Sequence, residues 1–298
     1  MMMFSAEHLQ TLVVLIEEGT FEAAARQLRL TPSAVSQRIK TMEQTSGQIL
    51  VQRTNPVLTT TAGDIALRYG RQLMLLEDET VKALEGSRHD GDAVTVPIAV
   101  NADSLATWFL EAVAEMAESS EVVFDIHRED QEHTTSLLRS GKVMAAVTSI
   151  PDAVQGCRSE RLGVMRYRAV CSPSYAERWL GGEASFAKLD QAPMVNFDRK
   201  DELQNRYFRG LTGRRPTAPR HFVPTSTDYG RAIKLGLGWG LLPEEQCDAE
   251  VADGSLLELA QDDPVDVPLH WQRWSLSSPL LDELSAAVKD TAGRHLHP

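Results

Sequence analysis

The strongest constraint on the fold is a Thr-Pro pair that follows two short helical segments near the start of the chain. Apolar residues recur at helical spacing over residues 8–18, and an alanine-rich second helix, capped by Thr20, is predicted for residues 21–28. Thr31 and Pro32 then supply a preferred N-cap and a preferred first-turn residue for a third helix. Two helices joined by a two-residue step predict a helix-turn-helix.

The third predicted helix has one apolar and one polar face. The polar side chains are Ser33, Ser36, Gln37 and Lys40. In a helix-turn-helix the second helix lies in the major groove, where its first turn meets phosphates with amides and hydroxyls. A glutamine offers a donor and an acceptor to base edges. This face therefore predicts DNA recognition.

Two short apolar runs, 49–51 and 57–59, predict a two-stranded wing with Arg53 on its arm, where arginine suits a narrow minor groove or a phosphate. Thr61 is expected to cap a long helix from Ala62 to about Glu85 with an apolar stripe. Such a stripe needs a partner. We expect the same helix of a second subunit, and packing on its own domain is the alternative.

The net charge of −12 conceals a local reversal, because residues 21–71 carry seven basic and three acidic side chains. A basic patch on an acidic body can dock on a polyanion in one orientation, although ordinary surface variation is the alternative. The three cysteines lack metal-ligand spacing and fit a reducing compartment. A basic leader and an apolar run of about 20 residues are both missing, which predicts a cytoplasmic protein without a membrane partner.

The rest of the chain alternates predicted strands and helices after a polar hinge at 87–92. Strands are expected at 94–100, 122–126, 143–148, 169–171, 194–197 and 221–223, and a helix is expected at 104–117. This order predicts parallel sheets with helices on both faces, in two subdomains with a cleft at the strand ends. The fold class is thus α+β with two domains: a winged helix-turn-helix with a long linker helix, and an α/β domain of two subdomains.

Polar side chains follow the first three strands of this domain, where a cleft is expected. They are Asn101, Asp103 and Ser104, then Glu129 and Asp130, then Thr148. Hydroxyls at a helix start suit a carboxylate, although Ser104 can simply cap its helix. The acids suit a cation, although such a run is more often a solvated face. Together they match a basic amino acid.

No catalytic constellation, metal site or cofactor motif is found. Gly236, Gly238 and Gly240 superficially match a dinucleotide loop, but the spacing is one residue short and Pro243 follows. The sequence also lacks GxSxG and HExxH. An enzyme acting on amino acids therefore stays a minor alternative, as does an amino-acid-binding protein that does not bind DNA.

The segment AARQLRLTPSAVSQRIKTME, the wing with Arg53 and the following TTTAG resemble the LysR-type transcriptional regulators. The resemblance implies a C-terminal half similar to periplasmic solute-binding proteins. It extends to NADSLATW, EDQEHT, GLGWGLLP and WQRW, which look like the subgroup typified by the ArgP and LysG regulators. That subgroup responds to lysine or arginine and switches on a basic amino-acid exporter gene. Gln131 departs from an acidic residue common there, so the choice between lysine and arginine stays open, and another metabolite is an alternative effector.

The resemblance also implies partners, boundaries and site residues. The partners are double-stranded DNA, a basic amino acid, a second copy in dimers that assemble into tetramers, and RNA polymerase. The expected boundaries are 1–60 for the DNA-binding domain, 61–86 for the linker helix, 93–165 with 268–298 for subdomain I, and 166–267 for subdomain II. The DNA-contacting residues would be Thr31, Pro32, Ser33, Ser36, Gln37, Arg38, Lys40 and Arg53. The effector-binding residues would be Asn101, Asp103, Ser104, Glu129, Asp130, Thr148, Asn196, Thr225 and Asp228.

Overall fold

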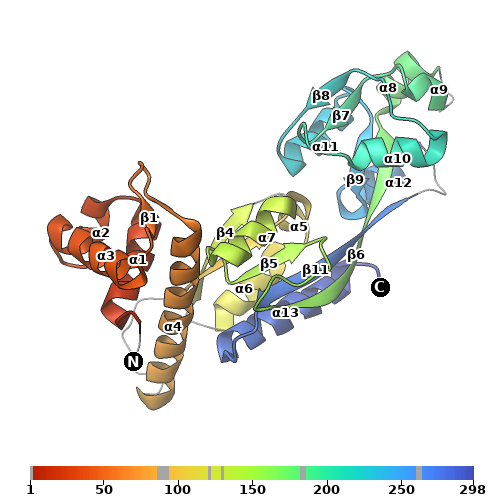
Figure 1. The fold of residues 1–298 in the computed structure, drawn as a ribbon. Helices are drawn as coiled ribbons and strands as arrows, with labels where there is room; N and C mark the ends of the chain where they lie inside the picture. The colour runs from red at the N-terminus through yellow and green to blue at the C-terminus, as the bar shows by residue number, and fades with distance from the viewer. Residues whose placement is uncertain (1–2, 86–93, 120–121, 129–130, 182–185, 260–263) are drawn as a thin grey trace.

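A computed structural model describes residues 3–85, 94–119, 122–128, 131–181, 186–259 and 264–298. The predicted hinge at 87–92 lies outside the described residues. The N-terminal head comprises three helices and a two-stranded wing (Figure 1). Its elements are α1 (Ala6–Glu18), α2 (Phe21–Gln27), α3 (Pro32–Ser46), β1 (Val51–Gln52) and β2 (Leu58–Thr59).

The helix starts of the head follow the sequence expectations. The Thr20 hydroxyl accepts a hydrogen bond from the Ala23 amide, and the Thr31 hydroxyl accepts one from the Ala34 amide. Leucines of α1 and the apolar face of α3 form one buried core with the wing. The helix-turn-helix prediction is therefore confirmed.

Helix α4 (Thr61–Glu85) stands between the head and the C-terminal half in Figure 1. The expected cap was wrong by one residue, since the Thr60 hydroxyl accepts from the Gly63 amide. The helix packs on α1 on one side and on α7 (Gln131–Ser140) on another. Ile65 and Leu84 nevertheless stay exposed, at 70% and 81%. Part of the apolar stripe therefore packs within the chain, as one alternative expected, and pairing of the outward-facing residues with a second subunit stays a prediction.

The C-terminal half is built on one seven-stranded sheet, in the order β10-β6-β11-β5-β3-β4 with β9 also paired to β6. A first unit holds the parallel strands β3 (Val94–Val100), β4 (Val122–Arg128) and β5 (Ala145–Thr148). Its helices are α5 (Ala102–Ala106), α6 (Phe109–Ser119), α7 and α13 (Pro279–His295).

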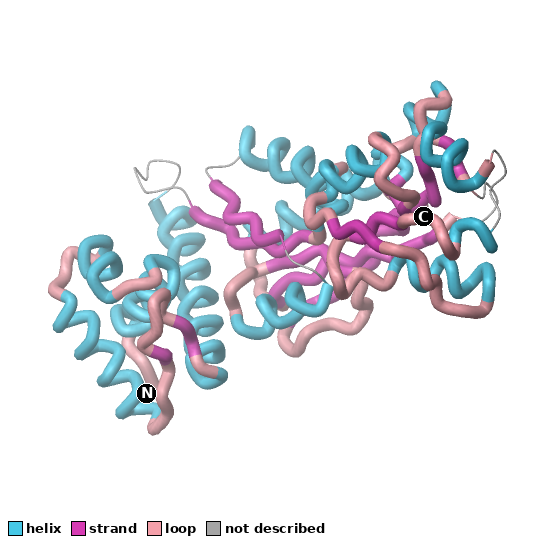
Figure 2. Tube along the Cα trace, turned by 90° about the horizontal axis from the view of Figure 1, so that it is seen from above, coloured by secondary structure: helices cyan, strands magenta, loops and turns pink. Residues whose placement is uncertain are grey.

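A second unit holds the parallel pair β7 (Met194–Asn196) and β8 (Arg220–Phe222), together with β9 (Gly240–Pro243) and β10 (Leu257–Glu258). Its helical segments are α8 (Pro173–Tyr175), η1 (Ala176–Leu180), α9 (Phe186–Leu189), α10 (Leu203–Thr212), α11 (Ser226–Lys234), η2 (Glu244–Gln246) and α12 (Asp248–Asp253). Two long antiparallel strands, β6 (Cys157–Cys171) and β11 (Val265–Trp274), run from one unit to the other, as Figures 1 and 2 show.

Helices cover both faces of the first unit, as predicted. Ile98 and Val147 point into the core beneath α6 and α13, whereas Ala99 and Ala146 face α7. This alternation is the period of two expected of buried strands. Trp239, Trp271 and Trp274 are fully buried, so all three are core residues.

Two expectations about single elements were wrong. The helix predicted at 104–117 is two helices, because Thr107 leaves helical geometry and the fully buried Trp108 anchors the break. Residues 169–171 do not begin a new parallel unit but end the antiparallel strand β6. Within the described ranges, no helix is long and apolar enough to cross a membrane.

The contact between α4 and the wing gives a stability test. A Cβ at Gly63 would lie 1.9 Å from the Leu50 carbonyl oxygen, so Gly63→Ala must displace the wing. We expect a loss of about 1–3 kcal/mol in the free energy of unfolding by urea denaturation. The helical Gly210→Ala is the control, since no atom lies within 4 Å of its Cβ position, and it should gain about 0.5–1 kcal/mol. Equal stabilities of the two variants would contradict the close packing.

Candidate DNA-binding and effector sites

The polar face of α3 is open to solvent. Thr31, Pro32, Ser33, Gln37 and Lys40 are exposed, and Ser36 is half-buried. Their opposite neighbours Val35, Ile39 and Met42 are fully buried. The core therefore fixes α3 and leaves the predicted DNA-contacting side chains at the surface of the head.

Two predicted arginines have partners within the head. Arg38 donates to the Glu7 carboxylate at 3.0 Å and to the Thr11 hydroxyl at 3.2 Å, so its guanidinium braces α3 against α1. Arg53, just after β1, lies over the ring of Phe21 at 5.4 Å from its centroid and stays exposed. The geometry thus leaves Arg53 available to a polyanion, whereas a phosphate would compete with Glu7 for Arg38.

The side chain of Asp103 connects two different parts of the C-terminal half. Its carboxylate accepts a hydrogen bond from the Tyr167 hydroxyl of β6 at 2.8 Å and one from the Ser226 hydroxyl of α11 at 2.7 Å. Asp103 belongs to α5 of the first unit, and Ser226 begins a helix of the second. The two units therefore touch at this carboxylate.

Desolvation raises the pKa of Asp103 above its ordinary value, the bonds from Ser226 and Tyr167 oppose the rise, and the negative charge of Asp201 adds to it. Burial, with the charge of Asp103, also holds the pKa of Tyr167 well above its usual range, so its hydroxyl stays a donor. Within the part of the chain that the structure describes, no cationic side chain pairs with Asp103. A carboxylate of this kind favours an added positive charge.

A polar network of the second unit lies next to Asp103. The Asn196 amide donates to the side-chain oxygen of Gln204 at 3.2 Å, and Gln204 donates to the Tyr229 hydroxyl at 2.6 Å. The fully buried Asn196 keeps its side-chain oxygen without a partner among the described residues. An acceptor in this position can receive a hydrogen bond from a ligand.

The structure brings together some predicted effector residues and not others. Ser104 is fully buried, and its hydroxyl has no partner among the described residues. The helix is capped by Asn101 and not by Ser104, since the Asn101 side chain accepts a hydrogen bond from the Ser104 amide. Thr148 is buried at the end of β5 and accepts from the Ile150 amide. Thr225 and Asp228 instead bond to each other, with Asp228 exposed.

Glu129 and Asp130, predicted beside Asp103, lie outside the described residues. The residues that sequence reasoning missed are Tyr167, Asp201, Gln204 and Tyr229. The first of these carried a signal, because Tyr167 falls on the inward phase of the alternation Gly163, Met165, Tyr167, Ala169. A hydroxyl on the buried side of a strand needs a hydrogen-bond partner.

Comparisons with known proteins agree with this architecture. The model of the bacterial regulatory helix-turn-helix proteins of the lysR family matches residues 6–64, and the model of the LysR substrate binding domain matches residues 89–293. The chain belongs to the LysR family. The predicted helix-turn-helix and the predicted two-unit C-terminal domain are both features of this family's structures.

Individual relatives span nearly the whole LysR-family chain. The lysine export transcriptional regulatory protein LysG of Corynebacterium efficiens is 42% identical over 287 residues, which are 96% of this chain and 97% of that protein. The crystal structure of ArgP from Mycobacterium tuberculosis superposes with a TM-score of 0.88 at 41% identity, covering 97% and 98% of the two chains. Full-length LysG from Corynebacterium glutamicum with bound effector Arg superposes with a TM-score of 0.79 at 38% identity, covering 99% and 100%.

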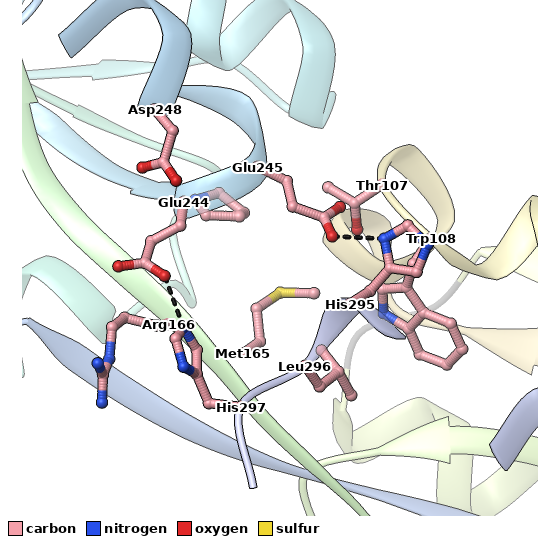
Figure 3. A pocket seen from close by; sticks show the side chains of 11 residues that line it. Thr107, Trp108, Met165, Arg166, Glu244, Glu245, Asp248, His295, Leu296 and His297 are labelled. Carbon is pink, nitrogen blue, oxygen red and sulfur yellow. Dashed lines mark hydrogen bonds and ion pairs between the residues drawn. The ribbon is translucent and has the colours of Figure 1, made fainter. Parts of the chain in front are cut away.

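A separate cavity of about 170 Å³ in this LysR-family protein lies between the C-terminus, β6 and η2 (Figure 3). No sequence-predicted site residue lines it. Its walls include a chain of ion pairs, since His295 bonds to Glu111 at 2.9 Å and to Glu245 at 2.6 Å, and His297 bonds to Glu244 at 2.6 Å. The C-terminal histidines therefore tie the first unit to the second.

The histidine contacts predict a pH-dependent stability. Burial disfavours the charged form of His295, but Glu245 and Glu111 outweigh it and raise its pKa above 6.5. The stabilisation is thus complete below the pKa of the unfolded state and is lost as the pH rises through the higher folded value. His295→Gln should therefore cost more free energy of unfolding at about pH 6 than at about pH 8.5, whereas exposed His221→Gln should cost little at either. A cost for His295→Gln that does not change with pH would contradict the charged contact.

Proposed function

We propose that the chain is a DNA-binding transcriptional regulator that senses lysine or arginine and controls a gene for a basic amino-acid exporter. The N-terminal head binds double-stranded DNA through α3 and the wing. The effector occupies the junction of the two units around Asp103. The relatives described as LysG and ArgP regulators, and the arginine bound to LysG of Corynebacterium glutamicum, support this function.

The observation that carries the effector class is the chemistry of Asp103. A partly desolvated carboxylate with two hydroxyl donors and no cationic partner among the described residues is stabilised by a cation. Lysine and arginine also carry a carboxylate, to which the buried Ser104 hydroxyl, without a partner in the described parts of the chain, can donate. In this assignment Asn101 positions the Ser104 segment, Thr148 and Asn196 border the site, and Thr225 and Asp228 support the start of α11.

In this proposal the domain boundaries are those expected from the sequence, and the units change their separation when the effector binds. Paired α4 helices, through their exposed apolar residues Ile65 and Leu84, would join subunits in dimers and tetramers. The effector then favours one assembly over another and alters contact with RNA polymerase. In this proposal the protein acts as a cytoplasmic regulator without catalytic activity, since the described residues of the site supply a carboxylate and hydroxyls but no activated nucleophile.

Calorimetric titration with lysine and arginine tests the effector site. Asp103→Asn removes the charge but keeps the shape, so affinity for the amino acid should fall by about 30-fold or more. Asp253→Asn is the matched control, because Asp253 is exposed at the end of α12, away from the proposed site, and accepts a hydrogen bond from the Ser255 amide that asparagine can keep. It should bind within about twofold of the wild type, as surface changes usually do. Unchanged binding by Asp103→Asn would remove Asp103 from the site.

Two substitutions in α3 separate base reading from phosphate contact. Lys40→Gln should weaken binding to all DNA sequences and lower the slope of log affinity against log salt by about 0.9. Gln37→Ala should leave that slope unchanged and reduce the preference for selected duplexes over random ones by about 1–3 kcal/mol. Fluorescence anisotropy over a series of salt concentrations measures both. A lowered slope for Gln37→Ala would contradict its role at a base edge.

A further inference from the structure

Arg68 of α4 is hydrogen-bonded to the loop that leads into β6. Its guanidinium donates to the carbonyl oxygens of Gln155 and Gly156, each at 2.9 Å. A Cβ at Gly156 would lie 2.6 Å from this guanidinium, and one at Gly141 would lie 2.4 Å from the Arg68 Cβ. Gly156 and Gly141 have left-handed φ angles, +75° and +74°, so no other residue type fits easily beside Arg68.

Arg71, one turn later, is 8% exposed and joins three helices. Its guanidinium donates to the carbonyl oxygens of Gly141 at 2.8 Å and Lys142 at 2.5 Å, just after the end of α7. It also donates to the Glu17 carboxylate of α1 at 3.0 Å. A cation just beyond the C-terminus of a helix donates hydrogen bonds to the free carbonyl oxygens there and interacts favourably with the helix dipole. The head is thereby bonded to the first unit through α4.

The same face of α4 continues this contact. Leu75 is buried in the core of the first unit, and the Glu79 carboxylate accepts from the Ser278 hydroxyl and the Leu280 amide at the start of α13. The positions 68, 71, 75 and 79 recur at three and four residues, so they lie on one side of the helix. Helix α4 therefore docks along the first unit as a rigid element.

The loop held by Arg68 begins at a candidate effector residue. The Ile150 amide donates to the Thr148 hydroxyl at 3.2 Å. The fully buried Gln272 then braces the loop, accepting from the Val154 amide and donating to the carbonyl oxygens of Ile150 and Asp152. Because these hydrogen bonds fix the loop, a displacement of Thr148 moves the loop as a whole.

We propose that Arg68 and Arg71, here called the arginine latch, couple the effector site to the DNA-binding head. Two segments link the site to the latch: the loop 149–156, which follows Thr148, and helix α7, which packs on β5 and ends at Ser140, just before Gly141. A shift of either segment moves its carbonyl oxygens against Arg68 or Arg71, and α4 passes the shift to α1 through Glu17. The proposal rests on the proposed function, and it specifies how that function is regulated within one subunit.

Coupling is reciprocal, so DNA binding must alter the effector unit through the latch even without an effector. The test is amide hydrogen exchange of the full-length protein, free and bound to a duplex selected from a random library by the wild-type protein. DNA should slow exchange in peptides covering 137–144 and 150–158 by about tenfold in the wild type. Arg68→Lys and Arg71→Lys keep the charge but lose the two-carbonyl grip, so the DNA effect should fall below about twofold.

The matched control is Arg139→Lys, because Arg139 is exposed on α7 near the same glycine. It should respond to DNA as the wild type does. The latch variants should keep their affinity for the selected duplex within about threefold, since Arg68 and Arg71 do not lie on the α3 face. The proposal is overturned if the single variant Arg68→Lys, folded by its circular dichroism spectrum, shows the full DNA effect, or if the wild type shows none.

Calorimetry on the same samples keeps the two proposals apart. If lysine and arginine give no heat with the wild type, the proposed effector is wrong, while the exchange experiment still decides the latch. If they bind and alter DNA affinity in the wild type, the change should fall to below about twofold in Arg68→Lys. A change of wild-type size in that variant would count against the latch and leave the effector assignment intact.

Discussion

The C-terminal half depends on one carboxylate that has lost much of its water and has no cationic partner in the part of the chain that the structure describes. Asp103 receives hydrogen bonds from Tyr167 and Ser226, and burial still raises its pKa. Hydroxyl donors stabilise a carboxylate only in part, so either a proton or a positively charged ligand lowers its free energy further. That imbalance favours a basic amino acid over a neutral metabolite as the effector.

The order of the elements along the chain places the Asp103 carboxylate among hydroxyl groups at the junction of the two units. Strand β6 runs through both units and delivers Tyr167, α5 delivers Asp103 from the first unit, and α11 delivers Ser226 from the second. A ligand at this point therefore contacts both units together. On the other side of the first unit, α4 is bonded to the end of α7 and to the loop before β6, so the head and the proposed effector site share a continuous set of contacts.

The local signals of the head made it predictable, and the C-terminal half was predictable only in outline. Thr20, Thr31 and Pro32 act within one turn of their own positions, so their roles could be seen in the chain itself. The partners of Asp103 could not, because Tyr167 and Ser226 are 64 and 123 residues away. The same distance effect hid β6 and β11, whose antiparallel pairing joins segments about 100 residues apart.

The proposed site recognises a positive charge on the effector side chain. Titration calorimetry with lysine and with norleucine, which has the same carbon chain without the terminal amine, tests this recognition. We expect lysine or arginine to bind to the full-length protein and norleucine to give no measurable heat at the same concentrations. Recognition of the charge would be contradicted if norleucine bound as tightly as lysine. It would also be contradicted if neither lysine nor arginine bound.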